Sequence, residues 1–270
     1  MQANRLLSSS LILAPAALFL LTALPASAQW FQFPGKNTPR IAEGKPNLSA
    51  PVPHTADGKP DLSGVWLGDQ WGPAGHRAVG PRTPAQAPEM LPWAEKVFAD
   101  RRANMGRDNP ESRCMPQGVP YASTLPYPFE IINAPGKMVM LYEMYSLRRM
   151  IFTDGRELPT DYASPSWMGY SVGKWEGDDF VADTSGFNDQ VWNIDLAGHP
   201  HSPDLHVIER FHRVDYGHMD INVTINDPKT YTKPWVMPAM RYTLLPDTDL
   251  LEFVCEKNLD PQHMVGKQGK

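Results

Sequence analysis

The sequence predicts an all-β fold, either an antiparallel up-and-down barrel or a strongly curved sheet, with one short helix and an extended N-terminal arm. Two-residue alternation of apolar and polar side chains, which is typical of strands, dominates the chain after residue 127. Turn-forming residues separate these runs in the way that β-hairpins require. Proline supplies 28 of the 270 residues, which argues against long uninterrupted helices.

Residues 1–28 have the pattern of a cleaved secretory signal peptide. Arg5 supplies the positive charge, Leu11–Leu24 supplies an apolar core, and Ala26–Ala28 forms an A-x-A cleavage site. The apolar run is interrupted by proline and is short for a membrane-spanning helix, and no second such run follows. We therefore expect a mature chain in the periplasm or outside the cell, without a transmembrane segment.

The mature chain is expected to consist of an extended Pro/Gly-rich arm at 29–60 and a single β-barrel domain at 61–270. A short motif, G-K-P-[N/D]-L-S, occurs twice in this part of the chain, at Gly44–Ser49 and at Gly58–Ser63. We expect both copies to lead into a strand in a similar way. Gly64–Leu67, directly after the second copy, is the first expected strand.

The other expected elements are one helix and eight β-runs. Pro92 in the first turn and a spaced apolar face indicate a helix at Leu91–Met105. The β-runs are Phe129–Ile132, Met138–Phe152, Trp167–Trp175, Asp179–Thr184, Leu205–Val214, His218–Asn226, Met240–Leu245 and Leu250–Cys255. The last six runs form three hairpins across short turns. Regular hairpins favour an up-and-down barrel, which at about eight strands can hold one ligand.

Composition and absent motifs exclude several classes of function. Lys plus Arg total 25 and Asp plus Glu total 30, so the net charge of −5 argues against nucleic-acid binding. The chain has no G-x-S-x-G elbow, phosphate-cradling glycine loop or C-x-x-C pair. These absences argue against an α/β-hydrolase, a nucleotide-binding loop, and a thioredoxin-type or c-haem site.

Several segments form specific motifs: Asp61–Trp66 (DLSGVW), Cys114–Pro120 (CMPQGVP), Pro128–Ile132 (PFEII), Arg149–Arg156 (RMIFTDGR), Pro165–Asp178 (PSWMGYSVGKWEGD), Glu209–Phe211 (ERF) and Tyr231–Trp235 (YTKPW). Together they resemble a large uncharacterised family of secreted bacterial proteins, over about residues 61–267. The resemblance implies secretion, a single domain and a lipocalin-like shape. It carries over no catalytic residues.

The two cysteines, Cys114 and Cys255, both lie after the signal peptide. In an oxidising compartment two such residues predict one disulfide. The alternative is a pair of buried free thiols that behave as small apolar side chains.

The connection between the expected strands at 179–184 and 205–214 is much longer than the two to five residues of a usual hairpin loop. It carries Asp189, His199 and His201, which are groups suited to proton transfer. We interpret it as part of a catalytic site. The alternative is a solvated loop whose Trp192 fills the barrel end.

Glu209 is the second candidate catalytic group. It alternates with Leu205, Val207 and Phe211, so its carboxylate is expected to point into the barrel. Burial there favours the protonated form that a general acid needs. The alternative is a structural ion pair with an inward Arg149, because buried charges need partners.

A metal site is weakly indicated. His199 and His201 have the two-residue spacing of cupin metal ligands, but Pro200 disfavours strand pairing between them. His206 and His212 share a strand face, so a three-His or two-His-carboxylate site stays an alternative. We expect no metal and no other cofactor.

Aromatic side chains and one arginine are the expected substrate-binding groups, because an aromatic wall can grip a ring. They are Trp167, Tyr170, Trp192, Arg149, Tyr231 and Trp235. The alternative is that these rings fill the barrel core.

These observations predict a secreted enzyme that acts on a small apolar or aromatic molecule by cofactor-independent acid–base chemistry, as a lyase, isomerase or hydrolase. Glu209, His201, His199 and Asp189 are the expected catalytic residues. The alternative is a non-catalytic small-molecule-binding protein, and a third possibility is an interaction module that uses the arm. An enzyme needs a titratable group inside the pocket, whereas a carrier needs only apolar lining.

Overall fold

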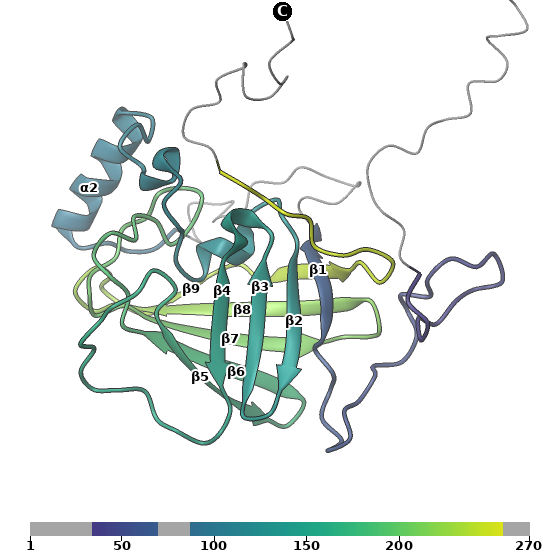
Figure 1. Ribbon diagram of the computed structural model, residues 1–270. Coiled ribbons are helices and arrows are strands. Elements are labelled where there is room, and N and C mark those ends of the chain that lie inside the picture. Colours follow the sequence, from purple (N-terminus) through teal and green to yellow (C-terminus); the bar gives the residue numbers. More distant parts are fainter. Residues whose placement is uncertain (1–33, 70–86, 256–270) are drawn as a thin grey trace, which may run out of the picture. The chain divides into compact units, whose positions relative to one another are not determined.

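The computed structural model describes residues 34–69 and 87–255, all within one compact unit (Figure 1). The expected signal peptide at 1–28, residues 29–33 of the arm, and residues 70–86 and 256–270 of the expected domain lie outside the described residues. Among the residues described, no helix is long and apolar enough to span a bilayer.

Nine strands close into a barrel, so the all-β prediction is confirmed in its closed form. They are β1 (Gly64–Gly68), β2 (Phe129–Ala134), β3 (Lys137–Tyr142), β4 (Arg148–Phe152), β5 (Tyr170–Glu176), β6 (Asp179–Ser185), β7 (His206–Arg213), β8 (His218–Asn226) and β10 (Met240–Leu244). They are hydrogen-bonded in this order, and β10 pairs with both β8 and β1 to close the ring. The two-residue strand β9 (Trp235–Val236) pairs with the far end of β8.

One pair of strands is parallel, in contrast to the fully antiparallel barrel that the sequence predicts. Ile151 and Phe152 of β4 pair with Ser171 and Val172 of β5, and no further residues of these strands pair. The segment 153–169 returns along the barrel before β5 begins, so both strands run in the same direction. Earlier in β4, residues 148–150 pair with β3 alone. We call this incompletely paired junction the seam.

Inward side chains of the strands fill the barrel. Trp66, Met140, Phe180, Phe211 and Ile221, from five different strands, are each fully buried. Burying a large apolar side chain contributes roughly 1.5–3 kcal/mol, so this interior is the main source of stability. On β7 the expected alternation is confirmed, with Val207, Glu209 and Phe211 buried.

The prediction of one continuous strand over Met138–Phe152 is wrong. A short 3-10 turn, η6 (Met144–Ser146), separates β3 from β4, which pair antiparallel. Tyr145 and Ser146 reverse the chain with φ values of 56° and 48°. The reversal also shifts the alternation, so Met140 of β3 and Arg149 of β4 both face inward.

The predicted strand at Leu250–Cys255 is also wrong, because these residues form no regular element. Instead they run across the end of the barrel, where Leu251 N–H donates to Glu143 Oε2 at 3.0 Å. The ring of Phe253 packs against Tyr127 and Tyr145.

The predicted disulfide between Cys114 and Cys255 is present. It joins Leu250–Cys255 to the excursion between β1 and β2, which contains the short 3-10 turns η4 (Pro110–Arg113) and η5 (Tyr121–Thr124). We call the segments 110–127, 143–146 and 250–255 the cap.

The predicted helix is α2 (Pro92–Ala103), which lies outside the barrel (Figure 1). The two copies of the G-K-P-[N/D]-L-S motif form the same small turn. Ile41 N–H donates to Lys45 O at 3.0 Å, and Thr55 N–H donates to Lys59 O at 2.9 Å. Only the second copy leads directly into a strand, β1.

Candidate functional site

A pocket of about 480 Å³ opens at the seam. Its walls come from the start of β4 and the turn before it, the segment that leads into β5, and the cap. The lining residues are Pro116, Ser146, Leu147, Arg148, Arg149, Met150, Phe152, Ser166, Trp167, Met168, Gly169 and Tyr170. We call it the seam pocket. It exists because β4 and β5 pair over only two residues, so side chains instead of strand backbone border the gap.

Aromatic and apolar side chains dominate the seam pocket, with Trp167, Phe152 and Tyr170 as its rings. Phe152 stacks on Tyr170 with ring centroids 5.2 Å apart. The Arg156 guanidinium lies 3.9 Å from the centre of the Phe152 ring and donates to Tyr170 Oη at 2.9 Å. Asp154 in turn binds Arg156 at 2.6 Å. This chain of contacts holds two of the three rings in fixed positions.

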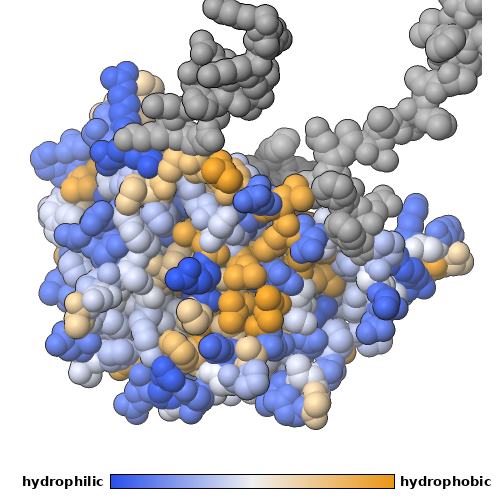
Figure 2. All heavy atoms as spheres, in the orientation of Figure 1, coloured by the Kyte–Doolittle hydropathy of each residue, from blue (hydrophilic) through white to orange (hydrophobic). Residues whose placement is uncertain are grey.

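Outside the pocket, the barrel wall carries an exposed apolar patch. Figure 2 shows apolar side chains gathered over β2 and β3 on the face in view. Ile132, Val139 and Met150 stand side by side on the outer face of β2, β3 and β4, since they are register partners. Met150 also lines the seam pocket, so the pocket opens beside this patch.

Inside the wall, Arg149 joins the seam pocket to a polar network in the barrel interior. Its side chain is 1% exposed, as is that of Glu209, its ion-pair partner. Arg149 Nε donates to Ser171 Oγ at 3.0 Å, and Nη2 donates to Thr184 Oγ1 at 2.8 Å and to Glu209 Oε2. Burial opposes the charge of Arg149, but the Glu209 carboxylate outweighs it and raises the pKa of the guanidinium.

Glu209 is held by this ion pair through one of its two oxygens. Within the part of the chain that the structure describes, Oε1 has no hydrogen-bond partner. Burial raises the pKa of Tyr142 and of Tyr242, so both phenols stay protonated in the interior. Tyr142 Oη lies 3.2 Å from Ser123 Oγ, and Tyr242 Oη donates to Ser123 O at 2.9 Å. The structure therefore gives Glu209 the ion-pair geometry that the sequence left as an alternative.

The long connection between β6 and β7 is a packed segment rather than a solvated loop. Asp195 and His199 are buried, and Asp195 Oδ2 lies 2.7 Å from His199 Nδ1. Asp195 Oδ1 also accepts hydrogen bonds from three backbone N–H groups at 3.1–3.2 Å. The His199 ring stacks on Phe98 of α2 at 4.3 Å and meets Trp235 edge-on at 5.0 Å. These contacts bind the connection to α2.

His201 and Asp189 occupy different environments within this connection. His201 Nδ1 lies 2.8 Å from Ser202 O and Nε2 lies 2.9 Å from Val191 O. Burial lowers the pKa of His201, despite these two carbonyl contacts. Asp189 is exposed. Neither residue lines the seam pocket.

The remaining predicted binding residues surround the same connection. The Arg101 guanidinium lies 4.4 Å from the centre of the Trp192 ring and donates to Gly198 O at 3.2 Å. Burial lowers the pKa of Arg101 to about 10. Tyr231 and Trp235 are buried, and Tyr231 Oη donates to Pro200 O at 2.7 Å. Trp192, Tyr231 and Trp235 therefore pack against α2 and the connection, away from the seam pocket.

The structure thus brings together Trp167, Tyr170 and Arg149 of the predicted site. It adds Met150, Phe152 and Arg148, which the sequence analysis did not single out. The sequence signal for them was the cluster of aromatic and arginine side chains on either side of the 153–169 connection. That cluster marks a site only when β4 and β5 are known to be neighbours.

No three His, Cys, Asp or Glu side chains in residues 34–69 and 87–255 lie close enough together to hold a metal ion. Comparisons with models of known protein families, with curated proteins and with solved structures found no match.

Proposed function

We propose that this chain is a secreted small-molecule-binding protein, and that the seam pocket holds a flat apolar or aromatic ligand. The observation that carries the proposal is the pocket itself. Its volume of about 480 Å³ lies within the usual range of ligand sites, and three aromatic rings line it. The 28-residue signal-like segment and the disulfide support a location outside the cytoplasm.

Binding without catalysis has more support than acid–base chemistry. Among the residues that line the seam pocket there is no Asp, Glu or His. His199 and His201 are hydrogen-bonded inside the β6–β7 connection, and Glu209 is bound to Arg149. The groups that a general acid and base would need are therefore apart from the place where a ligand fits. One observation still favours catalysis: Glu209 Oε1 has no hydrogen-bond partner among the residues that the structure describes.

A fluorescent probe tests the proposal directly. The neutral dye N-phenyl-1-naphthylamine, which brightens in apolar sites, should bind saturably with one site per chain. Trp167→Ala should weaken binding by about fivefold, because an aromatic contact contributes roughly 0.5–1.5 kcal/mol. Trp93→Ala is the matched control, since Trp93 is 43% exposed on α2 and does not line the pocket. Equal binding by wild type and Trp167→Ala would contradict the proposal.

A further inference from the structure

We propose that the seam pocket selects anionic ligands, namely aromatic carboxylates, and that Arg148 is the residue that binds the carboxylate. This inference rests on the proposed function, because it assigns a ligand class to the same pocket.

The first observation is the charge of the pocket lining. Two arginines, Arg148 and Arg149, are its charged residues, and no acidic side chain lines it among the residues described. The whole chain carries a net charge of −5, whereas the charged side chains that line this pocket are positive. An anion is the ligand that such a cavity favours.

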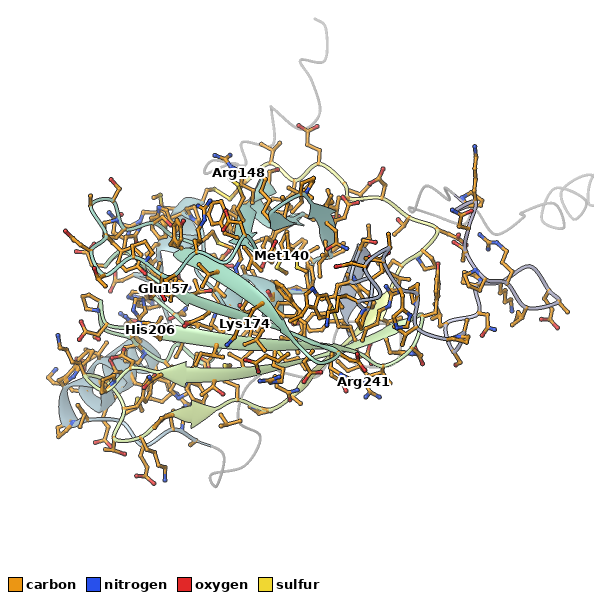
Figure 3. All side chains as sticks on the ribbon, turned by 90° about the horizontal axis from the view of Figure 1, so that it is seen from below. Met140, Arg148, Glu157, Lys174, His206 and Arg241 are labelled. Carbon is orange, nitrogen blue, oxygen red and sulfur yellow. A yellow bond between two sulfur atoms is a disulfide. The ribbon has the colours of Figure 1, made fainter. Side chains whose placement is uncertain are left out.

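The second observation is that the charge of Arg149 is already neutralised and that of Arg148 is not. Arg149 forms the buried ion pair with Glu209. The Arg148 side chain has no hydrogen bond or ion pair to any residue in 34–69 or 87–255. It is exposed at the mouth of the pocket, and Figure 3 shows it outside the barrel wall, whereas Met140 of the neighbouring strand lies inside.

On the barrel wall, the residue beside Arg148 is apolar and does not neutralise the charge of its guanidinium. Its register partner on β3 is Leu141, whose partner on β2 is Glu130. Glu130 is two strands from Arg148, a backbone separation of about 10 Å, and the two side chains form no ion pair in the described residues. The first wall position beside Arg148 is therefore apolar, and the guanidinium is free to meet a ligand.

The lining of the pocket favours a flat ligand with the charge at one end, because three rings line it and Arg148 is exposed at its edge. A guanidinium binds a carboxylate through two parallel hydrogen bonds, and this pairing is stronger beside apolar surface than in open water. A ring that packs against the aromatic lining would place a carboxylate at the exposed edge of the pocket within the surroundings of Arg148. Arg148 thus determines the preference for anionic ligands. The aromatic side chains supply the part of the binding affinity that charged and neutral ligands share.

Matched probes separate charge from shape. We would titrate 2-naphthoate and its neutral analogue 2-naphthamide into wild type, Arg148→Gln and Arg107→Gln by calorimetry. Arg107 is the control because it is exposed and does not line the pocket, while its replacement changes the net charge equally. Wild type should bind 2-naphthoate about tenfold more tightly than 2-naphthamide at low salt, and Arg148→Gln should abolish that difference. Arg107→Gln should keep it.

Each other outcome has a defined meaning. Equal affinity for the two probes in wild type, or an unchanged preference in Arg148→Gln, would overturn the anion proposal and leave pocket binding intact. Binding of neither probe would overturn this inference even if the neutral dye binds, and failure of the dye to bind as well would also overturn the proposed function.

Discussion

Arg149 and Glu209 are two opposite charges that the barrel buries almost completely. Removing two ions from water costs several kcal/mol each, and the attraction between them repays this only when both stay paired. Ser171 and Thr184 satisfy further N–H groups of Arg149, so the network depends on inward polar residues of β5 and β6. The pair is therefore more vulnerable to the loss of one partner than to the loss of both.

Glu209→Gln should lower the free energy of unfolding by about 3–5 kcal/mol, because Arg149 is left as an uncompensated buried cation. The double variant Arg149→Met, Glu209→Leu should cost clearly less than the single change. Urea unfolding measures both. Glu176→Gln is the control, since this exposed carboxylate pairs with Arg210 at the surface and its loss should barely change stability. A single variant as stable as wild type would show that the pair is not a structural requirement.

His201 predicts a dependence of stability on pH. Burial lowers its pKa in the folded state, whereas the unfolded chain keeps a value of about 6.5. The unfolded state then binds more protons as the pH falls below 6.5, so the stabilisation is complete above that pH and is lost on acidification. Urea unfolding at pH 7.5 and 5.5 should show a smaller loss for His201→Asn than for wild type. His54→Asn, at an exposed site, should behave as wild type does.

For individual residues of β7, the sequence predicted which side chains face inward but did not decide which residues they contact. Period-two alternation placed Glu209 inside, and it kept the ion pair with Arg149 as an alternative. The contact itself depends on β4 and β7 facing each other across the barrel, and no local pattern encodes that relation. His199 and His201 were predicted as catalytic groups because the length of a loop does not show how the loop is packed.

The seam between β4 and β5 is the element that turns a closed barrel into one with a pocket. Complete pairing would cover the gap with backbone hydrogen bonds, whereas two paired residues on each strand leave side chains to line it. At the closed end of the seam, Gly173 of β5 allows close packing. A Cβ atom there would lie 2.3 Å from Cζ of Phe180 and 2.8 Å from Cγ2 of Ile151.

Gly173→Ala should therefore destabilise the barrel by about 1–3 kcal/mol, because Phe180 and Ile151 are both fully buried and have little room to move. Phe180→Leu should restore part of this loss in the double variant, since it removes the ring atom nearest to the new methyl group. Thermal or urea unfolding of the two single variants and the double variant gives the coupling energy. Purely additive losses would show that the close approach to Phe180 is not the cause.

The turn between β3 and β4 and the parallel pair at the seam were mispredicted for different physical reasons. The turn between β3 and β4 contains neither Gly nor Pro, and Tyr145 and Ser146 adopt positive φ values that such residues rarely take. Alternation continues through it, so the sequence indicates one long strand. The parallel pair at the seam was missed because a connection such as 153–169 leaves the direction of the next strand open. By contrast, Gly177 and Gly217 mark their hairpins, whose strands were predicted to within one residue except for the start of β5, which lies three residues after the predicted Trp167.

Closure of the whole barrel depends on β10, which pairs with both β8 and β1 and so joins the two ends of the sheet. Hairpin patterns predicted an up-and-down sheet, but closure is a long-range pairing between the first strand and the last. The sequence therefore left the closed barrel and the curved sheet as alternatives. It also assigned β10 a hairpin partner at Leu250–Cys255, whereas those residues belong to the cap.

The cap ties the longest excursion of the chain to its C-terminal part and supplies one wall of the seam pocket. Pro116 and Ser146, which line the pocket, belong to it. Its small apolar core, Tyr121, Leu125 and Met144, is separate from the barrel core. Val119 and Ala122 of the 110–127 segment nevertheless belong to the barrel core, and Tyr242 Oη donates to Ser123 O, so this segment is also held to the barrel directly. The disulfide between Cys114 and Cys255 is the covalent link from this segment to 250–255.

Removing the disulfide should consequently affect stability and ligand binding together. The bond spans 141 residues, for which the chain-entropy relation gives roughly 5 kcal/mol, and measured losses for native disulfides are about 2–5 kcal/mol. Cys114→Ser, Cys255→Ser should show this loss in urea unfolding, and mass spectrometry of unreduced wild type should find the two cysteine peptides linked. Affinity for the neutral dye should also fall, because Pro116 of the pocket wall lies two residues from Cys114 and loses the nearby covalent link to 250–255. Wild type under reducing conditions is the second measurement, and it should match the serine variant. If stability falls while dye affinity stays at the wild-type value, the apolar cluster around Phe253 holds the cap without the covalent link, and the pocket is independent of the redox state of the cysteines.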